Sequence, residues 1–370
     1  MSKLKLATIV GTRPELIKLS ETIKLCDKLF DHVLIHTGQN YDYALNQVFF
    51  EGLNLRAPDH YLDVAGAHLG EMIGNVISRS YALLSEIKPD AALILGDTNS
   101  AMSAISAKRL KIPVFHMEAG NRCFDENLPE EINRRIIDHI SDVNLPYTEH
   151  ARRYLQSENI RPEYTFVVGS PMREVLTNNA KPSDVLTRLE LNADGYIVLS
   201  AHREENIDIE DNFFSLMNSI NDMAERFGLP VIYSVHPRSA KFIERREFVF
   251  HPLVRRVKPF GFSDYIALQE CAFCVVSDSG TLAEESGILG FAAVSIRTST
   301  ERPEAVEKGC FVLGGIEGAG LIQAVTSAVS LRGRGASVPD YGDSDVSAKV
   351  AGIIQGYTGI VNKMIWRKKV

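Results

Sequence analysis

Short, continuously apolar runs alternate along this chain with segments of helical periodicity, and this alternation constrains the fold more than any other feature. Two such runs are AALIL at 91–95 and IPVFHM at 112–117, and each ends in small or polar residues. A strand that is apolar throughout is typical of a parallel sheet with helices on both faces. The sequence therefore predicts an α/β protein built from doubly wound parallel sheets.

The alternation occurs twice, so we expect two Rossmann-like domains whose loops face a common cleft. A chain of 370 residues also exceeds what one core ordinarily holds. The first series of strands ends with a predicted strand at 164–169, and the second begins with YIVLSAH at 196–202. We place an N-terminal domain at 1–177 and a C-terminal domain at 178–350. A last helix within 351–370 is expected to pack back on the N-terminal domain.

Composition and motifs exclude several classes of function. The net charge of -7 argues against nucleic acid as the main partner. The chain has no apolar run of membrane-spanning length, and its start reads as a first strand rather than a signal peptide, so we expect a cytoplasmic protein with no membrane partner. The ten histidines show no metal-binding spacing, and the single CxxC among the five cysteines, Cys271 to Cys274, has no second pair or flanking histidine. Because dinucleotide and P-loop fingerprints are also missing, we expect no metal and no cofactor.

Three acidic residues in the first half follow apolar strands or open a helix. Asp97 and Glu118 come just after two of the buried runs, and Glu130 follows Pro129 at a predicted helix start. Since the carboxyl ends of parallel strands share one edge of the sheet, we expect these carboxylates to meet at one site. The alternative is that Asp97 caps a helix and Glu130 only complements a helix dipole.

Basic residues and one histidine follow other predicted strands. Arg13 and Lys18 stand at the start of the first helix, where free N–H groups already favour an anion. His202 lies in the polar stretch SAHREEN and could donate to a phosphate or protonate a leaving group. A solvated surface position for Arg13 and a purely structural role for His202 remain alternatives.

The second half contains a loop suited to a diphosphate. Ser279 and Gly280 lie between an apolar strand and a helix that carries Glu285, and Arg302 follows in a later loop. Exposed N–H groups and a hydroxyl suit phosphate oxygens, and a glutamate can hold ribose hydroxyls. A plain helix cap at Asp278 or Ser279 is the alternative. Spacing alone indicates an anionic, diphosphate-bearing ligand next to carboxylates.

At these residues the chain resembles the non-hydrolysing UDP-N-acetylglucosamine 2-epimerase family. The motifs GTRPELIK, GDTNS, HMEAGNR, PEEINR, SAHREEN, DSGTLAEE and TERPEA occur in the family's order over nearly the whole chain. The resemblance implies the two-domain fold of one large class of glycosyltransferases (GT-B), a homodimer, and chemistry without metal or nicotinamide. It also implies that UDP leaves carbon 1 and returns while carbon 2 is inverted.

The resemblance further implies roles for single residues. Asp97, Glu118 and Glu130 match the family's acid/base carboxylates, and His202 matches a residue that assists the diphosphate. The positions that match the UDP-binding residues are Arg13, Lys18, His202, Ser279, Gly280, Glu285 and Arg302. This chain has Gly280-Thr281 where the family often has two glycines. Gln39 is followed by Asn40 instead of histidine, so we expect no activation by UDP-N-acetylglucosamine.

The stretches TGQNYDY, FHMEAGNRCFDENLPEEINRRIIDHISDVNL and GSPMREVL look most like one subgroup of the family. That subgroup converts UDP-2-acetamido-2,6-dideoxy-L-talose to UDP-N-acetyl-L-fucosamine, a precursor of capsule and O-antigen. The alternatives are a UDP-N-acetylglucosamine 2-epimerase that forms UDP-N-acetylmannosamine, a GT-B glycosyltransferase, and a sugar-nucleotide sensor without catalysis.

Overall fold

The computed structural model describes residues 3–38, 50, 52–335 and 337–369. Within them the chain divides into two compact units. Unit 1 comprises Met1–Asn179 and Pro339–Val370, and unit 2 comprises Ala180–Val338. The first boundary between the units thus lies after residue 179, two residues beyond the predicted domain boundary at 177. The C-terminal segment of unit 1 begins at Pro339, earlier than the expected 351.

Unit 1 contains a parallel sheet of six strands among its described residues. Its strands are β1 (Lys5–Val10), β2 (Asp31–His36), β3 (His60–Tyr61), β4 (Ala91–Leu95), β5 (Val114–Met117) and β6 (Val143–Leu145). Its helices are α1 (Arg13–Leu29), α3 (Leu69–Ile87), α4 (Ser103–Arg109), α5 (Pro129–Ile140), α6 (Glu149–Ser157), α7 (Met172–Asn179) and α16 (Val346–Met364), with 3₁₀ helices η1 (Asn99–Met102), η2 (Pro162–Tyr164) and η3 (Pro339–Tyr341).

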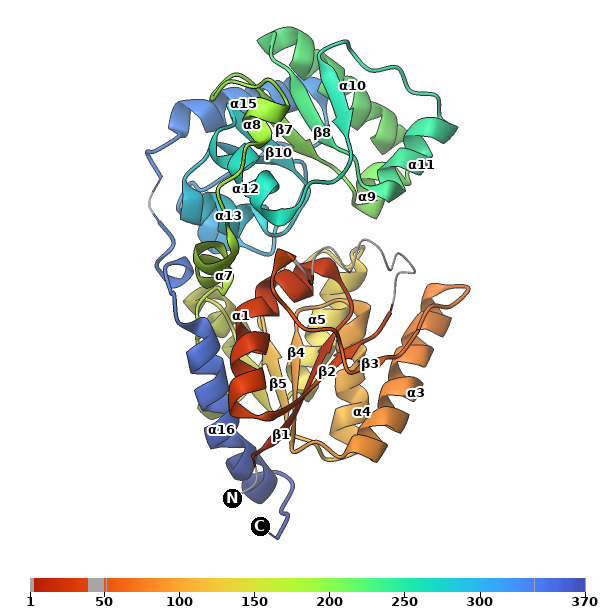
Figure 1. Ribbon diagram of the computed structural model, residues 1–370, viewed down its shortest axis with the longest axis vertical. Helices are drawn as coiled ribbons and strands as arrows, with labels where there is room; N and C mark the ends of the chain where they lie inside the picture. The colour runs from red at the N-terminus through yellow and green to blue at the C-terminus, as the bar shows by residue number, and fades with distance from the viewer. Residues whose placement is uncertain (1–2, 39–49, 51, 336, 370) are drawn as a thin grey trace. The chain divides into compact units, whose positions relative to one another are not determined.

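Unit 2 repeats this plan with a second parallel sheet, also six-stranded within the described chain. The strands are β7 (Ile197–Ser200), β8 (Val231–Ser234), β9 (Val254–Val257), β10 (Cys274–Ser277), β11 (Ala293–Ser295) and β12 (Val312–Leu313). The helices are α8 (Val185–Arg188), α9 (Glu204–Ile207), α10 (Glu210–Phe227), α11 (Pro237–Arg245), α12 (Phe262–Glu270), α13 (Leu282–Leu289), α14 (Pro303–Glu307) and α15 (Gly318–Leu331). Figure 1 shows both sets of elements.

The two sheets have the same strand order, which confirms the predicted fold class. The order is β3-β2-β1-β4-β5-β6 in unit 1 and β9-β8-β7-β10-β11-β12 in unit 2. Counted from the first strand of each unit, both read 3-2-1-4-5-6, the doubly wound Rossmann order. All five residues of β4 are buried, as its apolar sequence predicts for a strand covered on both faces.

Helix α16 belongs to unit 1 although it lies at the end of the chain. It packs beside α1, and Figure 1 shows the blue C-terminal helix next to the red N-terminal one. The carboxylate of Glu174, on α7, accepts hydrogen bonds from the backbone N–H of Ser347, at 2.9 Å, and from its hydroxyl. The last helix therefore completes the layer of helices on unit 1.

One predicted strand is wrong. The segment 164–169 was expected to be a strand, but it forms only an isolated parallel bridge between Asn144 and Thr165. Phe166 and Val168 still donate N–H bonds of 3.0 Å to the carbonyls of Asn144 and Pro146. Pro146 has no N–H to donate in return, so the ladder cannot continue along this edge.

The tight turn at Gly120 provides a test of packing beside the sheet edge. Gly120 has φ +82° and Gly96 has φ +70°, a region that disfavours side chains. An added Cβ at Gly120 would overlap the carbonyl oxygen of Ala151, whereas one at Gly96 would meet nothing within 4 Å. We expect Gly96→Ala to cost about 1 kcal/mol of unfolding free energy and Gly120→Ala about 3 kcal/mol or more. Urea denaturation of both variants measures this, and equal losses would contradict the predicted clash.

Candidate active site

Most of the predicted site residues lie at the topological switch point of their own unit. In unit 1 this point is the carboxyl end of β1 and β4, and in unit 2 it is the carboxyl end of β7 and β10. At a switch point the connections leave the sheet in opposite directions, so a crevice opens between the loops. Lys18 and Asp97 follow the first pair of strands, and His202 and Ser279 follow the second pair.

The first contact in unit 1 joins Lys18 to Glu118, which are 100 residues apart in the chain. Lys18 Nζ lies 2.6 Å from Glu118 Oε2, and both side chains are largely buried. The same ammonium lies 5.7 Å from the centre of the Tyr147 ring. Glu118 has φ +63°, a strained value for a residue with a long side chain. Such strain is typical of residues whose side chain must point in one functional direction.

The second contact joins Asp97 to Arg134 of α5. Asp97 Oδ2 accepts from Arg134 Nε at 3.0 Å and from Nη2 at 2.5 Å. Arg134 also donates from Nη1 to Glu131 Oε2 at 2.6 Å, so one guanidinium holds two carboxylates. The backbone carbonyl of Asp97 accepts from Asn133 Nδ2 at 2.8 Å. Helix α5 therefore fixes the loop after β4.

The neighbouring residues Glu130 and Glu131 have different environments. Glu131 is fully buried and accepts from the backbone N–H groups of Cys123 and Phe124, at 3.1 and 3.3 Å. Burial acts to raise the pKa of Glu131, but the hydrogen bond from the Cys123 N–H and the Arg134 charge lower it overall. Glu131 thus anchors the loop before α5, and Glu130 is half-buried in the first turn of that helix. Arg13, in the first turn of α1, is exposed.

A buried carboxyl that the sequence analysis missed lies between these loops. Glu15 accepts from Gly11 N–H at 3.1 Å, from the Thr12 hydroxyl at 2.7 Å and from the Ser100 hydroxyl at 2.5 Å. It therefore links the loop after β1 to the loop after β4. Burial raises the pKa of Glu15 to about 7, although these hydrogen bonds act to lower it. Nothing in the sequence signals this role, because a glutamate in the first turn of a helix is common.

In unit 2, His202 is paired with a buried aspartate. His202 Nδ1 lies 2.9 Å from Asp278 Oδ1, and the other oxygen of Asp278 accepts the backbone N–H groups of His202 and Arg203. Burial acts to raise the pKa of Asp278, but the His202 charge and these hydrogen bonds lower it overall. A carboxylate that fixes Nδ1–H orients the imidazole and stabilises its cationic form. The His202 side chain is 36% exposed, so it is accessible to a ligand.

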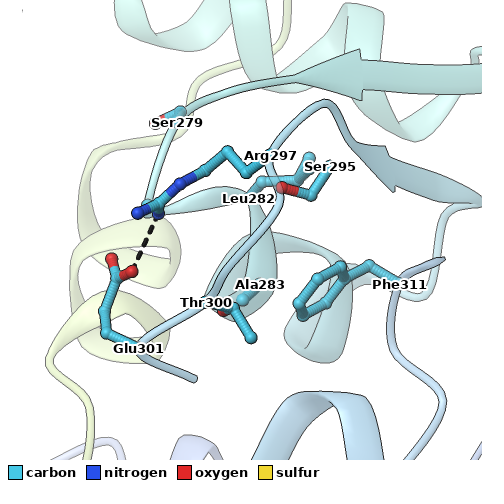
Figure 2. A pocket seen from close by; sticks show the side chains of 9 residues that line it. Ser279, Leu282, Ala283, Ser295, Arg297, Thr300, Glu301 and Phe311 are labelled. Atoms are coloured by element: carbon cyan, nitrogen blue, oxygen red, sulfur yellow. Dashed lines mark hydrogen bonds and ion pairs between the residues drawn. The ribbon is translucent and has the colours of Figure 1, made fainter. Parts of the chain in front are cut away.

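The loop that follows β10 lies against a buried ion pair. The Ser279 and Thr281 hydroxyls are 3.0 Å apart, and α13 begins at the next residue. Arg297 Nη1 donates to Glu301 Oε2 at 2.8 Å beside this loop, as Figure 2 shows. A Cβ added at Gly280 would lie 2.9 Å from Glu301 Oε1, so a glycine suits this position.

Two other predicted ligands of UDP are held by buried partners. Arg302, 2% exposed, donates from Nη2 to Glu284 Oε2 at 3.3 Å. Glu285 Oε2 accepts from Gln269 Nε2 at 2.7 Å. The structure therefore gathers His202, Ser279 and Gly280 around Asp278 and the start of α13, with Arg302 held on the same helix through Glu284.

The family model for UDP-N-acetylglucosamine 2-epimerase matches residues 24–355 of this chain. The chain belongs to this family. It is therefore an isomerase, an epimerase acting on UDP-sugars, and the predicted family resemblance is confirmed.

Three known proteins show how far the likeness extends. The structure of a UDP-N-acetylglucosamine 2-epimerase from Rickettsia bellii is 44% identical, has a TM-score of 0.91, and the alignment covers 99% of this chain and 100% of that one. The Methanocaldococcus jannaschii epimerase, solved with UDP-N-acetylglucosamine and UDP, is 34% identical with a TM-score of 0.90, over 95% of this chain and all of that one. These likenesses agree with two Rossmann-like units of the GT-B type. UDP-2,3-diacetamido-2,3-dideoxy-D-glucuronate 2-epimerase of Pseudomonas aeruginosa is 30% identical over 94% of this chain and 98% of its own length.

Three further expectations concern metal ions, membranes and activation. Among the described residues, no group of three or more histidine, cysteine or acidic side chains is placed to hold a metal ion. The helices described here include none long and apolar enough to cross a membrane. The stretch Gln39 to Asp42, on which the expectation about activation depends, lies outside the described residues.

The raised pKa of Glu15 predicts a pH-dependent stability. Its folded pKa of about 7 exceeds the ordinary value of 4.5, so the folded state binds the proton more tightly. Stability from this group is therefore present below about pH 4.5 and is lost as the pH rises to about 7, by roughly 3 kcal/mol. Glu15→Gln mimics the protonated form, and its stability relative to the wild type should increase by about 2.5 kcal/mol between about pH 5 and pH 8. Urea denaturation at both pH values tests this, and a constant difference would show that Glu15 does not titrate in this range.

Proposed function

We propose that this enzyme inverts carbon 2 of a UDP-2-acetamido sugar by eliminating UDP and adding it back. The observation that carries the proposal is the pair of carboxylates at one sheet edge, Asp97 and Glu118, each within hydrogen-bonding distance of its own cation. The hydrogen on carbon 2 is not next to a carbonyl, so its direct removal is difficult. Expulsion of UDP first leaves an electron-poor carbon 1, and a carboxylate can then take the neighbouring proton.

In this proposal the acids of unit 1 act on the sugar. Removal of the proton gives a glycal, and inversion requires that a proton return to the opposite face. Two groups that exchange protons on opposite faces explain why more than one carboxylate is needed. Lys18, at 2.6 Å from Glu118, can stabilise that carboxylate after it loses a proton. Glu130 is the third candidate for an acid/base group. It lies in the first turn of α5, directly after the loop that Arg134 and Glu131 hold in place.

The polar loops of unit 2 bind and stabilise the departing UDP. The His202–Asp278 pair supplies an oriented imidazole donor, and the Ser279 hydroxyl and the first N–H groups of α13 supply further donors. Donors that are already in place stabilise developing negative charge without reorganisation. Arg302 adds positive charge, with Arg13 and Lys18 of unit 1 as further candidates for the anion. Glu285 is proposed to bind the ribose.

For the sugar, we propose the conversion of UDP-2-acetamido-2,6-dideoxy-L-talose to UDP-N-acetyl-L-fucosamine in capsule or O-antigen synthesis. The long motif from Phe115 to Leu145 and the stretch GSPMREVL support this choice. UDP-N-acetylglucosamine is the second candidate substrate, because the Rickettsia bellii protein with 44% identity is named a UDP-N-acetylglucosamine 2-epimerase. We further propose that the enzyme works as a homodimer, as the resemblance implies.

One experiment tests both the reaction and the substrate. The purified protein is incubated in deuterated water with each candidate UDP-sugar, and proton NMR follows the product. We expect epimerisation without an acceptor or cofactor, fastest with the L-talose compound, and deuterium at carbon 2 of the product. Retention of the original hydrogen would exclude elimination and re-addition. Release of free sugar and UDP would indicate hydrolysis instead.

The proposed division of roles predicts opposite effects of two kinds of substitution. Asp97→Asn, Glu118→Gln and Glu130→Gln should each lower turnover by about 10²–10⁴-fold, because general acids and bases contribute this much. UDP binding, measured by calorimetry, should stay largely intact. Arg302→Ala should weaken UDP binding itself.

Glu126→Gln is the matched control, because Glu126 lies in the loop before α5 and its side chain is 74% exposed. It should change neither turnover nor UDP binding. Carboxylate variants that lose UDP, together with an Arg302→Ala variant that binds UDP normally, would refute the division of roles.

A further inference from the structure

His116 occupies the end of β5 two residues before Glu118, and it is fully buried. Each of its ring nitrogens faces a different part of unit 1. Nδ1 lies 2.9 Å from Asp138 Oδ1 on α5, and Nε2 lies 2.9 Å from the backbone carbonyl oxygen of Gly96, at the end of β4. The ring therefore bridges the residue before Asp97 to a helix behind the sheet edge.

The carboxylate of Asp138 is surrounded by donors. It accepts from the backbone N–H of Gly120 at 3.2 and 3.1 Å and from Arg122 Nη1 at 2.7 Å. Burial acts to raise the pKa of Asp138, but the hydrogen bond and charge of His116 and the charge of Arg122 lower it overall. The guanidinium of Arg122 and the backbone N–H of Gly120 can only donate, so both oxygens of Asp138 are acceptors in these contacts.

Both partners of the imidazole are thus acceptors, because a backbone carbonyl also has no proton to give. A neutral imidazole carries one N–H and would leave a lone pair facing one of these oxygens. Only the doubly protonated ring satisfies both contacts. We infer that His116 is held as an imidazolium and acts as the positioning residue that sets the two strand ends bearing Asp97 and Glu118.

The charges around the ring are consistent with a buried cation. Arg122 bridges Asp138 to Glu158, the residue after α6. Its Nε and Nη2 lie 2.7 and 2.6 Å from the Glu158 carboxylate, and His139 of α5 lies 3.2 Å from the same carboxylate. His116 and Arg122 therefore balance Asp138 and Glu158. Other charged groups described at this edge are Lys18 with Glu118, and Arg134 with both Asp97 and Glu131. The carboxyl group of Glu15 also lies here, hydrogen-bonded to the Ser100 hydroxyl.

The network acts on the acids through the backbone. Gly96 directly precedes Asp97, and its carbonyl is held by the charged ring. Gly120 follows Glu118 by two residues, and its N–H is held by Asp138. Glu118 has φ +63°, and such a conformation persists only where its neighbours over-determine it. One His–Asp pair thus fixes both segments, and the proposal rests on the role of Asp97 and Glu118 in the proposed function.

A second buried histidine in the same sheet, on the other side of β1 and β4, provides a comparison with His116. His32, in β2, is also buried and also paired with a carboxylate, with Nδ1 2.6 Å from Asp27 Oδ1. Its Nε2, however, lies 2.8 Å from the Thr8 hydroxyl, which can donate a proton as well as accept one. A neutral His32 therefore satisfies both contacts, and burial lowers its pKa despite the Asp27 partner.

The protonation state is tested on the wild-type chain labelled with ¹⁵N-histidine. Long-range ¹H–¹⁵N correlation spectra are recorded without ligand at about pH 7.5 and 8.5, above the ordinary histidine range. The His116 signals are assigned by their loss from the spectrum of His116→Gln. If that variant does not fold, they are assigned by their change in chemical shift in Asp138→Asn. Two protonated ring nitrogens on His116, and one on His32, are expected. A bare nitrogen on His116 would overturn the inference, and this result is independent of which sugar the enzyme takes.

The positioning role is tested by kinetics. His116→Gln should lower kcat by about 10²-fold, the loss expected when reacting groups are misplaced by about 1 Å. UDP binding should be unchanged, and His32→Gln should reduce stability without lowering kcat. Asp138→Asn should introduce a new ionisation in the kcat profile, because the histidine loses its counter-charge. A normal kcat and pH profile in these variants would overturn the positioning role. If His116 proved cationic but no UDP-sugar reacted, that result would count against the proposed function alone.

Discussion

The carboxylate of Asp138 is the interaction on which the proposed active site of unit 1 depends. It contacts His116, the backbone N–H of Gly120 and Arg122 directly, and His116 in turn contacts the carbonyl of Gly96 after β4. A buried charge is tolerated only when it is paired and fully hydrogen-bonded, and this one has donors on both oxygens. The acids that we assign to catalysis stand on segments that this carboxylate holds, so their geometry does not rely on their own flexible side chains.

The site concentrates charge where a protein built for stability alone would place apolar groups. Lys18, Glu118 and Arg134 are largely buried, and burial raises the pKa of the Glu15 carboxyl group to about 7. Glu118 adds backbone strain to these costs. Such features carry a stability penalty, and they are typical of sites that must present groups in one geometry before the ligand arrives. The cores of the two units, made of aliphatic and aromatic side chains from sheet and helices, offset that penalty.

The two units share one topology, and we propose a different kind of chemistry for each. Both place polar loops at the switch point of a 3-2-1-4-5-6 sheet. In unit 1 the loops carry carboxylates paired with cations, which suits proton transfer. In unit 2 they carry a His–Asp pair and the start of a helix, which suits an anionic leaving group. The fold supplies the position in each case, and the loop residues decide the chemistry.

The sequence by itself determined the fold class, the family and the residues that stand at the strand ends. Apolar runs such as 91–95 predict parallel strands, and in a parallel sheet every loop that follows a strand reaches the same edge, so Asp97, Glu118 and His202 could be found without coordinates. Their partners could not be found, because Lys18 and Glu118 are 100 positions apart and Asp97 and Arg134 are 37 apart. Local sequence also cannot distinguish Glu15, which bridges two loops, from an ordinary first-turn glutamate, or tell the buried Glu131 from Glu130 beside it. Only the tertiary structure decided these environments, because burial and hydrogen-bond partners depend on which distant segments pack together, and hydrophobic periodicity does not encode that choice.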